Sequence, residues 1–341
     1  MTQELISLLA SGISFGVTAA LGKKVIPWLH KLKYGQTIKE IGPKWHEKKQ
    51  GTPTMGGIMF IAGILISMLI CLPLYYYLRS SGSLISSYED ATSYWVRIIA
   101  GILMAVMFGA VGFLDYYIKV VKKQNDGLTP RQKMIFMTLI TGAFLTTLAL
   151  SGDATVTTIP FCTGDVDVGF WFYPISLIMI VGFVNAVNLT DGIDGLCSSV
   201  TFFAAIVFIV IAGMHSMFGM SIFAAAVAGG CLGFLVWNFF PAKVFMGDTG
   251  SLFLGGLFCA MAYGVNMPIL IPLVGIIYLC EAGSVMLQVS YFKLTHGKRI
   301  FKMSPIHHHF EMSGWSEVKI VWVFSVITLI AGVAAVALSI A

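Results

Sequence analysis

Long, nearly uninterrupted stretches of apolar residues recur along the chain, and short polar segments separate them. Each stretch approaches the roughly 20 residues that a helix needs to cross the ~30 Å hydrocarbon core of a bilayer. Strands of a membrane barrel would instead alternate apolar and polar residues over segments of ~10 residues. The pattern therefore predicts about ten transmembrane helices. Their expected boundaries are Leu5–Gly22, Met55–Leu72, Trp95–Leu114, Met134–Leu150, Phe172–Val187, Leu196–His215, Gly219–Trp237, Leu252–Val265, Ile269–Val289 and Val318–Ile340.

Composition narrows the class of protein further. Of the 341 residues 57% are hydrophobic and only 11% are charged, whereas an ordinary soluble domain carries roughly 25% charged residues. Disordered chains need low hydrophobicity and high net charge. A soluble globular enzyme and a disordered chain are therefore excluded. We expect an all-α polytopic membrane protein that forms a single integral membrane domain over residues 1–341. The six cysteines are scattered without a C-x-x-C pair, so neither a zinc site nor a disulfide framework is expected.

Basic residues predict the orientation in the membrane. All of the 21 Lys and Arg residues except Arg79 and Arg97 fall in the loops after the first, third, seventh and ninth predicted spans, if Lys319 at the start of the tenth span is counted with the loop before it. Because cytoplasmic loops are enriched in Lys and Arg, these loops are predicted to face the cytoplasm. An even number of spans then places both termini outside. On the outer side, Ser80–Ser93 is serine-rich, and two alternating stretches within Gly152–Gly169 predict a small hairpin.

Polar residues, which are costly in a membrane protein, collect near the predicted inner ends of the spans. Asp115 ends the third span, Asp191 and Asp194 follow the fifth, Asp248 precedes the eighth, and His307–His309 follow the ninth. Carboxylates without cysteine suit Mg²⁺, which prefers a few carboxylates plus phosphate oxygens to a closed protein cage. Nearby lysines can offset phosphate charge. The set predicts phosphate chemistry at the inner membrane surface, and capping of helix ends is the structural alternative.

Three further features leave alternatives open. Asn188, Asp191 and Asp194 are three residues apart and would share one face if that stretch were helical. The three histidines are either donors or proton-transfer groups near neutral pH, or solvated loop residues. Glu281 lies inside the ninth predicted span, where it marks an ion pathway or pairs with a polar group in the helix bundle; we favour the structural role.

Five motifs along the chain are Gly51-Thr52-Pro53-Thr54-Met55-Gly56-Gly57, Gly112-Phe113-Leu114-Asp115, Asn185–Gly195, Gly247-Asp248-Thr249-Gly250-Ser251 and Pro305–Glu311. With them the chain resembles the phospho-N-acetylmuramoyl-pentapeptide transferase family of integral membrane enzymes, within the polyprenyl-phosphate hexose-1-phosphate transferase superfamily. The motifs with carboxylates indicate the superfamily, and the first and last motifs are more particular to the family. The resemblance covers essentially the whole chain.

The resemblance implies a homodimer of ten-helix subunits in the bacterial inner membrane, a cleft facing the cytoplasm, and Mg²⁺ dependence. The implied reaction transfers phospho-N-acetylmuramoyl-pentapeptide from UDP-N-acetylmuramoyl-pentapeptide to undecaprenyl phosphate, giving lipid I and UMP for peptidoglycan synthesis. No nucleic acid partner is expected.

Three alternatives to this function have different support. The triple histidine argues against an N-acetylglucosamine-1-phosphate transferase that uses the same lipid. A secondary transporter would need polar groups at the bilayer midplane and often repeated halves, and the sequence has no visible repeat. A non-catalytic scaffold is the third.

The resemblance also assigns residues. The catalytic positions are Asp115, Asp191, Asp194, Asp248, His307, His308 and His309, and the expected metal ligands are Asp248 and Asp191. The substrate-binding positions are Lys49, Thr54, Lys119, Lys133, Asn185, Asn188, Asn238, Phe245 and Arg299. Of these, Asn188, Asn238 and Phe245 fall where the family holds the uridine nucleotide.

The chain departs from the family at Tyr116, where a second consecutive aspartate is usual. A phenol with a pKa near ~10 stays neutral and cannot replace a carboxylate as a metal ligand or base. It can still donate a hydrogen bond to phosphate. We expect that Asp115 suffices for the chemistry.

Overall fold

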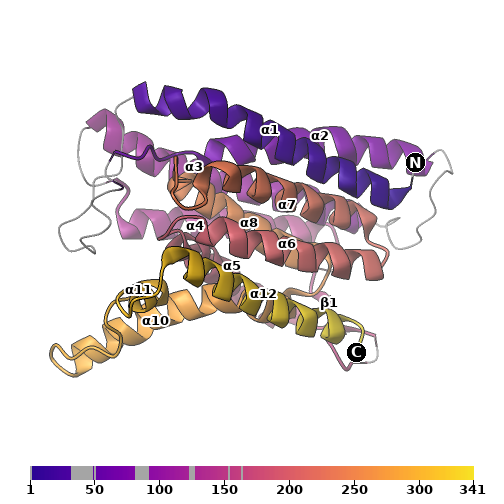
Figure 1. Ribbon diagram of the computed structural model, residues 1–341. Helices are drawn as coiled ribbons and strands as arrows, with labels where there is room; N and C mark the ends of the chain where they lie inside the picture. The colour runs from indigo at the N-terminus through magenta and orange to yellow at the C-terminus, as the bar shows by residue number, and fades with distance from the viewer. Residues whose placement is uncertain are drawn as a thin grey trace.

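The computed structural model describes residues 2–31, 49, 51–80, 92–122, 127–152, 154–162 and 164–341, and helices dominate it (Figure 1). The lysine-rich loop from Lys33 to Lys48 and the serine-rich outer loop at 81–91 lie outside the described residues. The helices are α1 (Gln3–Lys31), α2 (Gly57–Ser80), α3 (Thr92–Lys122), α4 (Pro130–Leu150), α5 (Phe172–Thr190), α6 (Leu196–Met214), α7 (Phe218–Asn238), α8 (Gly247–Gly264), α9 (Ile271–Val274), α10 (Ile276–Leu294), α11 (Ile306–Glu311) and α12 (Glu317–Ser339), with 3-10 helices η3 (Gly169–Trp171) and η4 (Pro268–Leu270).

The described helices support a polytopic all-α membrane protein, with fewer clear spans than the ten expected. Eight are long and apolar enough to cross a membrane, or nine if the bent pair Pro268–Val274 and Ile276–Leu294 forms one span. The expectation of one continuous ninth span was wrong, because this pair bends by 74°. The expected span Leu252–Val265 corresponds to α8, which is not among the eight. Its first turn is polar, and every residue from Thr249 to Gly264 is buried by protein.

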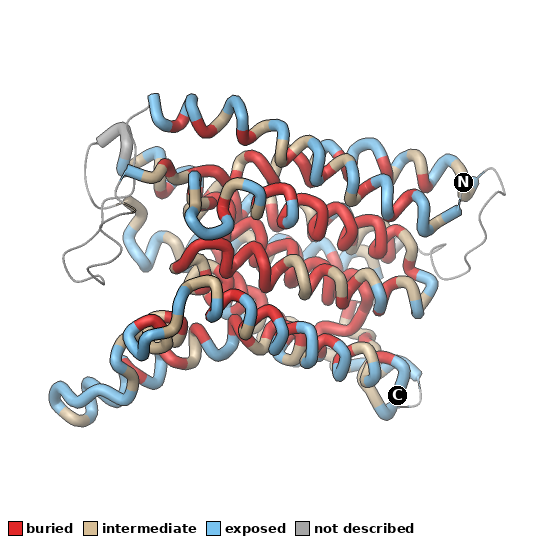
Figure 2. Tube along the Cα trace, in the orientation of Figure 1, coloured by how far each residue is buried: buried red, intermediate tan, exposed pale blue. Residues whose placement is uncertain are grey.

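The helix α8 therefore forms the centre of the bundle. It packs along α3 and α5, while α7 packs along α1 and α6. Figure 2 shows buried residues concentrated in the middle of the bundle and exposed residues along the outer helices α1 and α12. Without a strong hydrophobic drive between helices in lipid, small residues let membrane helices approach closely. At Gly112 of α3 a Cβ atom would overlap the backbone of Asp248. This contact brings the C-terminal part of α3 and the N-terminal end of α8 together.

A small hairpin covers the end of the bundle at which both termini lie (Figure 1). Strand β1 (Val156–Thr158) pairs antiparallel with β2 (Asp165–Asp167), with Val156 opposite Asp167. This confirms the hairpin predicted within Gly152–Gly169. The Thr157 hydroxyl donates to the Asn266 carbonyl oxygen at 2.8 Å, so the hairpin is fixed to the connection that follows α8.

Close packing of α1 and α7 gives a test of the fold. A Cβ atom at Gly229 of α7 would overlap the Ser11 carbonyl oxygen of α1, whereas a Cβ atom at Gly16 has open space within 4 Å. We expect Gly229→Ala to lower the free energy of unfolding by about 1–3 kcal/mol, since the helices must separate. Gly16→Ala should change it by less than about 0.5 kcal/mol. Thermal unfolding of both variants in detergent measures the difference, and equal midpoints would contradict this packing.

Candidate active site

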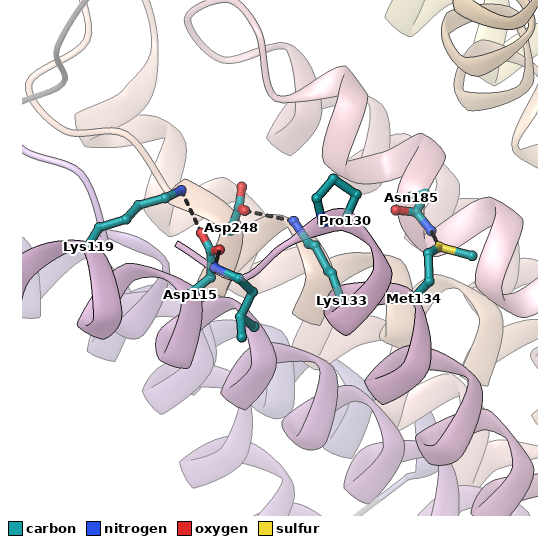
Figure 3. A pocket seen from close by; sticks show the side chains of 8 residues that line it. Asp115, Lys119, Pro130, Lys133, Met134, Asn185 and Asp248 are labelled. Atoms are coloured by element: carbon teal, nitrogen blue, oxygen red, sulfur yellow. Dashed lines mark hydrogen bonds and ion pairs between the residues drawn. The ribbon is translucent and has the colours of Figure 1, made fainter. Parts of the chain in front are cut away.

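Four helices meet at a cavity of about 310 Å³ (Figure 3). Helix α3 contributes Asp115 and Lys119, α4 contributes Lys133, α5 contributes Asn185, and α8 contributes Asp248. The remaining lining residues are Leu128, Pro130 and Met134. Figure 3 shows the two carboxylates between the two lysine ammonium groups. The cavity therefore offers both cationic and anionic groups to a ligand.

Asp115 fixes the α3 side of the cavity. Its Oδ2 atom lies 2.6 Å from Lys119 Nζ, one helical turn further on, and its Oδ1 atom accepts the Leu128 backbone N–H at 2.7 Å. A Cβ atom at Gly127 would overlap Asp115 Oδ1, so the backbone before α4 can pass this close to the carboxylate only because residue 127 is glycine. Asp115 is buried, while the Lys119 side chain keeps 43% of its surface exposed. The carboxylate therefore anchors the start of α4 and leaves Lys119 accessible.

Local sequence explains how α4 places Lys133. Thr129 and Gln132 form a reciprocal capping box, and Pro130 occupies the first turn. This arrangement satisfies otherwise orphaned N–H groups and fixes the start of the helix. Lys133 then lies in the second turn, where its Nζ atom donates to Asp248 Oδ2 at 2.8 Å.

Asp248 connects α4, α5 and α8. Besides the bond from Lys133, its Oδ1 atom accepts from Asn188 Nδ2 at 3.0 Å, and Asn188 also donates to Ser251 Oγ at 2.7 Å. The Asp248 side chain keeps 34% of its surface exposed. A carboxylate that is held firmly but remains accessible can still bind a cation or orient a phosphate group.

The Gly51–Gly57 motif forms a backbone clasp on the segment before α8. The Phe245 N–H donates to the Pro53 carbonyl oxygen at 2.9 Å, and the Gly56 N–H donates back to the Phe245 carbonyl oxygen at 2.8 Å. Gly247 has φ +67°, and a Cβ atom there would lie 2.8 Å from Thr54 Oγ1. Thr54 and Phe245 therefore help to position the turn that carries Asp248.

The segment Asp191–Gly195, called here the acidic loop, is not helical. Helix α5 ends at Thr190, so Asn188, Asp191 and Asp194 do not share a helix face. Gly195 has φ +77° and caps the start of α6. Both carboxylate oxygens of Asp194 are used by the protein, through Lys49 Nζ at 2.7 Å and the Ala242 N–H at 2.8 Å.

Glu317 completes this arrangement and was missed by sequence reasoning. Its Oε2 atom accepts from Lys49 Nζ at 2.6 Å and from the Asp194 N–H at 3.0 Å. Glu317 begins α12, where an acidic residue also complements the helix dipole. No sequence signal distinguishes it from an ordinary helix-start residue, because its partners are distant in the chain.

Asp191 differs from the other carboxylates because its charged neighbours are themselves acidic. Burial, followed by the negative charges of Asp248 and Asp194, raises its pKa to about 7, and a hydrogen bond from the Gly247 backbone acts in the opposite direction. The described residues contain no group of three His, Cys, Asp or Glu side chains that could hold a metal ion. Mg²⁺ needs no such group when phosphate oxygens complete its coordination. Asp191 and Asp248 keep exposed surface and are the candidate ligands for such an ion, whereas Asp194 is buried.

The three histidines bind three different partners. His307 Nδ1 lies 2.9 Å from Glu281 Oε2, and His308 Nδ1 lies 2.6 Å from Glu311 Oε2. His309 Nδ1 accepts the Lys302 N–H at 3.1 Å. The pairing of Glu281 agrees with the structural role favoured for it. The rings of His307 and His308 nevertheless lie side by side, with centroids 4.1 Å apart.

The remaining substrate-binding candidates are in different environments. Asn238 is buried, and its amide accepts the Gly195 N–H at 3.2 Å and donates to the Val244 carbonyl oxygen at 2.9 Å. Asn185 donates to the Val181 carbonyl oxygen of its own helix while it lines the cavity. Arg299 is exposed between α10 and α11 and does not line the cavity. Substrate binding by these residues stays a prediction.

Comparison with known proteins identifies the family. Residues 98–266 match the model of glycosyl transferase family 4, and residues 49–61 match a phospho-N-acetylmuramoyl-pentapeptide-transferase signature. A phospho-N-acetylmuramoyl-pentapeptide-transferase of Clostridium perfringens (strain SM101 / Type A) is 46% identical over 323 residues, covering 95% of this chain and 94% of the relative. That of Listeria monocytogenes serotype 4b (strain CLIP80459) is 48% identical over 324 residues, covering 95% of each.

The chain belongs to the phospho-N-acetylmuramoyl-pentapeptide-transferase family. It is therefore a transferase with several membrane-crossing helices. The glycosyl transferase family 4 match spans most of α3 through α8, which carry the charged residues of the cavity. The signature at residues 49–61 contains the clasp and Lys49. The phospho-N-acetylmuramoyl-pentapeptide-transferase family is thus recognised by elements that surround one site.

The raised pKa of Asp191 predicts a dependence of stability on pH. Between its ordinary value near 4 and about 7, the folded protein binds more protons at this group than the unfolded chain, so stability falls as pH rises. We expect Asp191→Asn to remove this contribution of residue 191 to the pH dependence of stability. In EDTA, the thermal midpoint of the unsubstituted protein should fall more steeply from pH 5 to pH 8 than that of the variant. Asp165→Asn, in the exposed hairpin, is the control. Parallel curves for all three proteins would contradict the assignment.

Proposed function

We propose that the protein transfers phospho-N-acetylmuramoyl-pentapeptide from UDP-N-acetylmuramoyl-pentapeptide to undecaprenyl phosphate, giving lipid I and UMP. The observation that carries the proposal is the cavity in which Lys119 and Lys133 stand beside Asp115 and Asp248. Family membership supports the choice of substrates. A site for two phosphorylated substrates needs fixed cationic groups with carboxylates that keep them in place.

We propose that the site faces the cytoplasm from the bacterial inner membrane. The alternation of basic loops supports this orientation. Both termini lie at one end of the bundle and α11 lies at the other (Figure 1), as expected for an even number of crossings. From the family resemblance we also propose a homodimer.

The chain's own residues act mainly by alignment and charge. Exchange of one phosphoanhydride for another has a barrier that positioning and electrostatic stabilisation lower. In the proposed step, an oxygen of the lipid phosphate forms a bond to the sugar-bearing phosphorus, and the bond to the UMP oxygen breaks. Lys119 and Lys133 offset the charge of the phosphates. Asp115 holds Lys119 and the start of α4 in place.

A strong general base is not required in this proposal. The second pKa of a phosphate ester is ~6, so the lipid phosphate is mostly dianionic at pH 7 and already nucleophilic. The Asp115 carboxylate is occupied by Lys119 Nζ and the Leu128 N–H. Both contacts support a positioning role for Asp115.

We infer that Asp248 and Asp191 would hold Mg²⁺. When bound, the ion would neutralise charge on the diphosphate and make UMP a better leaving group. Asp194 is buried, unlike Asp248, and its carboxylate oxygens bind Lys49 and the Ala242 N–H, so we assign it to support of the acidic loop.

The proposed function predicts dependence on Mg²⁺ and on Asp248. Purified protein with UDP-N-acetylmuramoyl-pentapeptide and undecaprenyl phosphate should release UMP in Mg²⁺ and not in EDTA. We expect Asp248→Asn to lower kcat at least about a hundredfold, because it removes a charge that the cavity is built around. Asp165→Asn is the control. Mass analysis of the lipid product checks the transfer. Preferential use of UDP-N-acetylglucosamine would instead favour an N-acetylglucosamine-1-phosphate transferase that uses the same lipid.

The departure at Tyr116 gives a separate test. Asp115 holds the contacts at this end of α3, and we expect Tyr116→Asp to change kcat by much less than about a hundredfold. The same UMP assay measures it, with Tyr117→Asp as the control for an added charge on α3. A rise of more than about a hundredfold in Tyr116→Asp alone would mean that a second aspartate is required.

A further inference from the structure

A buried carboxyl group in α10 contacts the histidine motif. Glu281 has no exposed surface, and it is the sole acidic residue of α10. Its Oε2 atom lies 2.9 Å from His307 Nδ1 and 3.5 Å from the His307 backbone nitrogen. Its Oε1 atom is buried and has no hydrogen-bond partner among the described residues.

His307 connects this carboxyl group to the acidic loop. The ring has no exposed surface, and its Nε2 atom has no hydrogen-bond partner in the part of the chain that the structure describes. A Cβ atom at Gly192 would overlap His307 Nε2 and lie 2.6 Å from its Cε1 atom. The ring therefore fills the space that glycine leaves free. Glu281, His307 and Gly192 form one line of contact from α10 through α11 to the backbone between Asp191 and Asp194.

Stability alone does not explain this arrangement. Burial of a carboxyl and an imidazole is costly unless their polar atoms are satisfied, and a partly satisfied buried network is worse than an apolar core. Helix α11 has only six residues, too few to be stable by itself, so contacts outside the helix must fix His307. The Glu281 carboxyl group supplies such a contact at both the ring and the backbone.

The acidic loop is held on its other side by different residues. Lys49 and Glu317 bind the side chain and backbone of Asp194. The contact at Gly192 acts two residues earlier, next to Asp191. Gly192 directly follows Asp191, so displacement of the His307 ring would remove the packing contact next to Asp191 and leave its backbone held by the hydrogen bond to the Asn188 carbonyl oxygen at 3.3 Å.

We propose that Glu281 is a positioning residue for the transfer reaction. It holds His307 against Gly192, and the ring in turn fixes the acidic loop so that Asp191 points toward Asp248. His307, being enclosed, acts as a support and does not touch substrate in this arrangement. The inference rests on the proposed function for its activity measurement only, because the position of the loop can be measured without catalysis.

Two substitutions at Glu281 separate hydrogen bonding from volume. Glu281→Leu removes the acceptor, and Glu281→Gln keeps an acceptor oxygen of the same reach. Ser284→Ala, a buried residue of the same helix whose hydroxyl bonds only the Glu281 carbonyl oxygen in the described contacts, is the control. Gly192→Ala reaches the same contact from the loop side, so the test does not depend on one variant folding.

Hydrogen exchange of the backbone amides in residues 191–196 is the first measurement, on full-length protein in detergent. We expect Glu281→Leu and Gly192→Ala to speed this exchange by about tenfold or more, with the exchange in helices α1 and α7 unchanged.

The second measurement is UMP release. Glu281→Leu should lower kcat by about tenfold to a hundredfold while KM for the lipid phosphate changes less than about twofold. Glu281→Gln should stay close to the unsubstituted protein in both exchange and kcat. Ser284→Ala should show neither effect.

Each other outcome has a defined meaning. Unchanged exchange in residues 191–196 in both Glu281→Leu and Gly192→Ala would overturn the proposal. Equal acceleration of exchange in all helices would overturn it as well, because it would show general destabilisation. Equal effects of Glu281→Leu and Glu281→Gln would exclude the hydrogen bond between residue 281 and His307 as the cause and would also overturn the proposal. If the unsubstituted protein released no UMP but the loop responded as expected, the proposed function would fail and the positioning of the loop would stand.

Discussion

The arrangement of the site depends on backbone contact between α3 and α8 at Gly112. A side chain there would overlap the Asp248 backbone, and helices that meet through side chains are typically ~8–10 Å apart. Because Gly112 precedes Asp115 by less than one turn, the same contact places Asp115 and Asp248 beside one cavity. The clasp of the Gly51–Gly57 motif then fixes the turn before Asp248. Glycine at these points is thus the condition for bringing the charged groups together.

Charge pairing at the cavity explains which carboxylates remain available. Asp115 and Asp194 are buried and have both oxygens bonded to the chain itself. Buried ion pairs are weak evidence for stability, since desolvation offsets their attraction. They do fix where an ammonium group lies, and here they hold Lys119 and Lys49. Asp191 differs because its neighbours are acidic, so a cation delivered with a phosphorylated ligand would relieve the repulsion.

The sequence predicted local features well and long-range contacts poorly. The apolar stretches located most helices, and alternation over Gly152–Gly169 located the hairpin. Hydrophobicity alone could not separate α8, which protein buries on all sides, from a helix that faces lipid. Spacing suggested a shared helix face for Asn188, Asp191 and Asp194, but α5 ends at Thr190 and Asp191 is its cap.

The contacts of the site show why the rest was out of reach. Lys49 and Glu317 are 268 residues apart, and Glu281 and His307 are 26 apart. No local pattern encodes such pairs. The family resemblance placed the candidate residues, but their partners required the fold.

The division of the site between segments suggests how one cavity is specialised. The part that matches glycosyl transferase family 4, residues 98–266, contains the lysines and carboxylates of the cavity. The residues that hold the acidic loop from outside, namely Lys49, Glu281, His307 and Glu317, all lie beyond that part of the chain. Phosphate chemistry needs the charges, but those charges act only where their backbone is fixed. The N-terminal signature and the C-terminal helices therefore set the geometry in which the shared charged core works, and differences between related transferases are expected to lie in these supporting contacts as much as in the cavity itself.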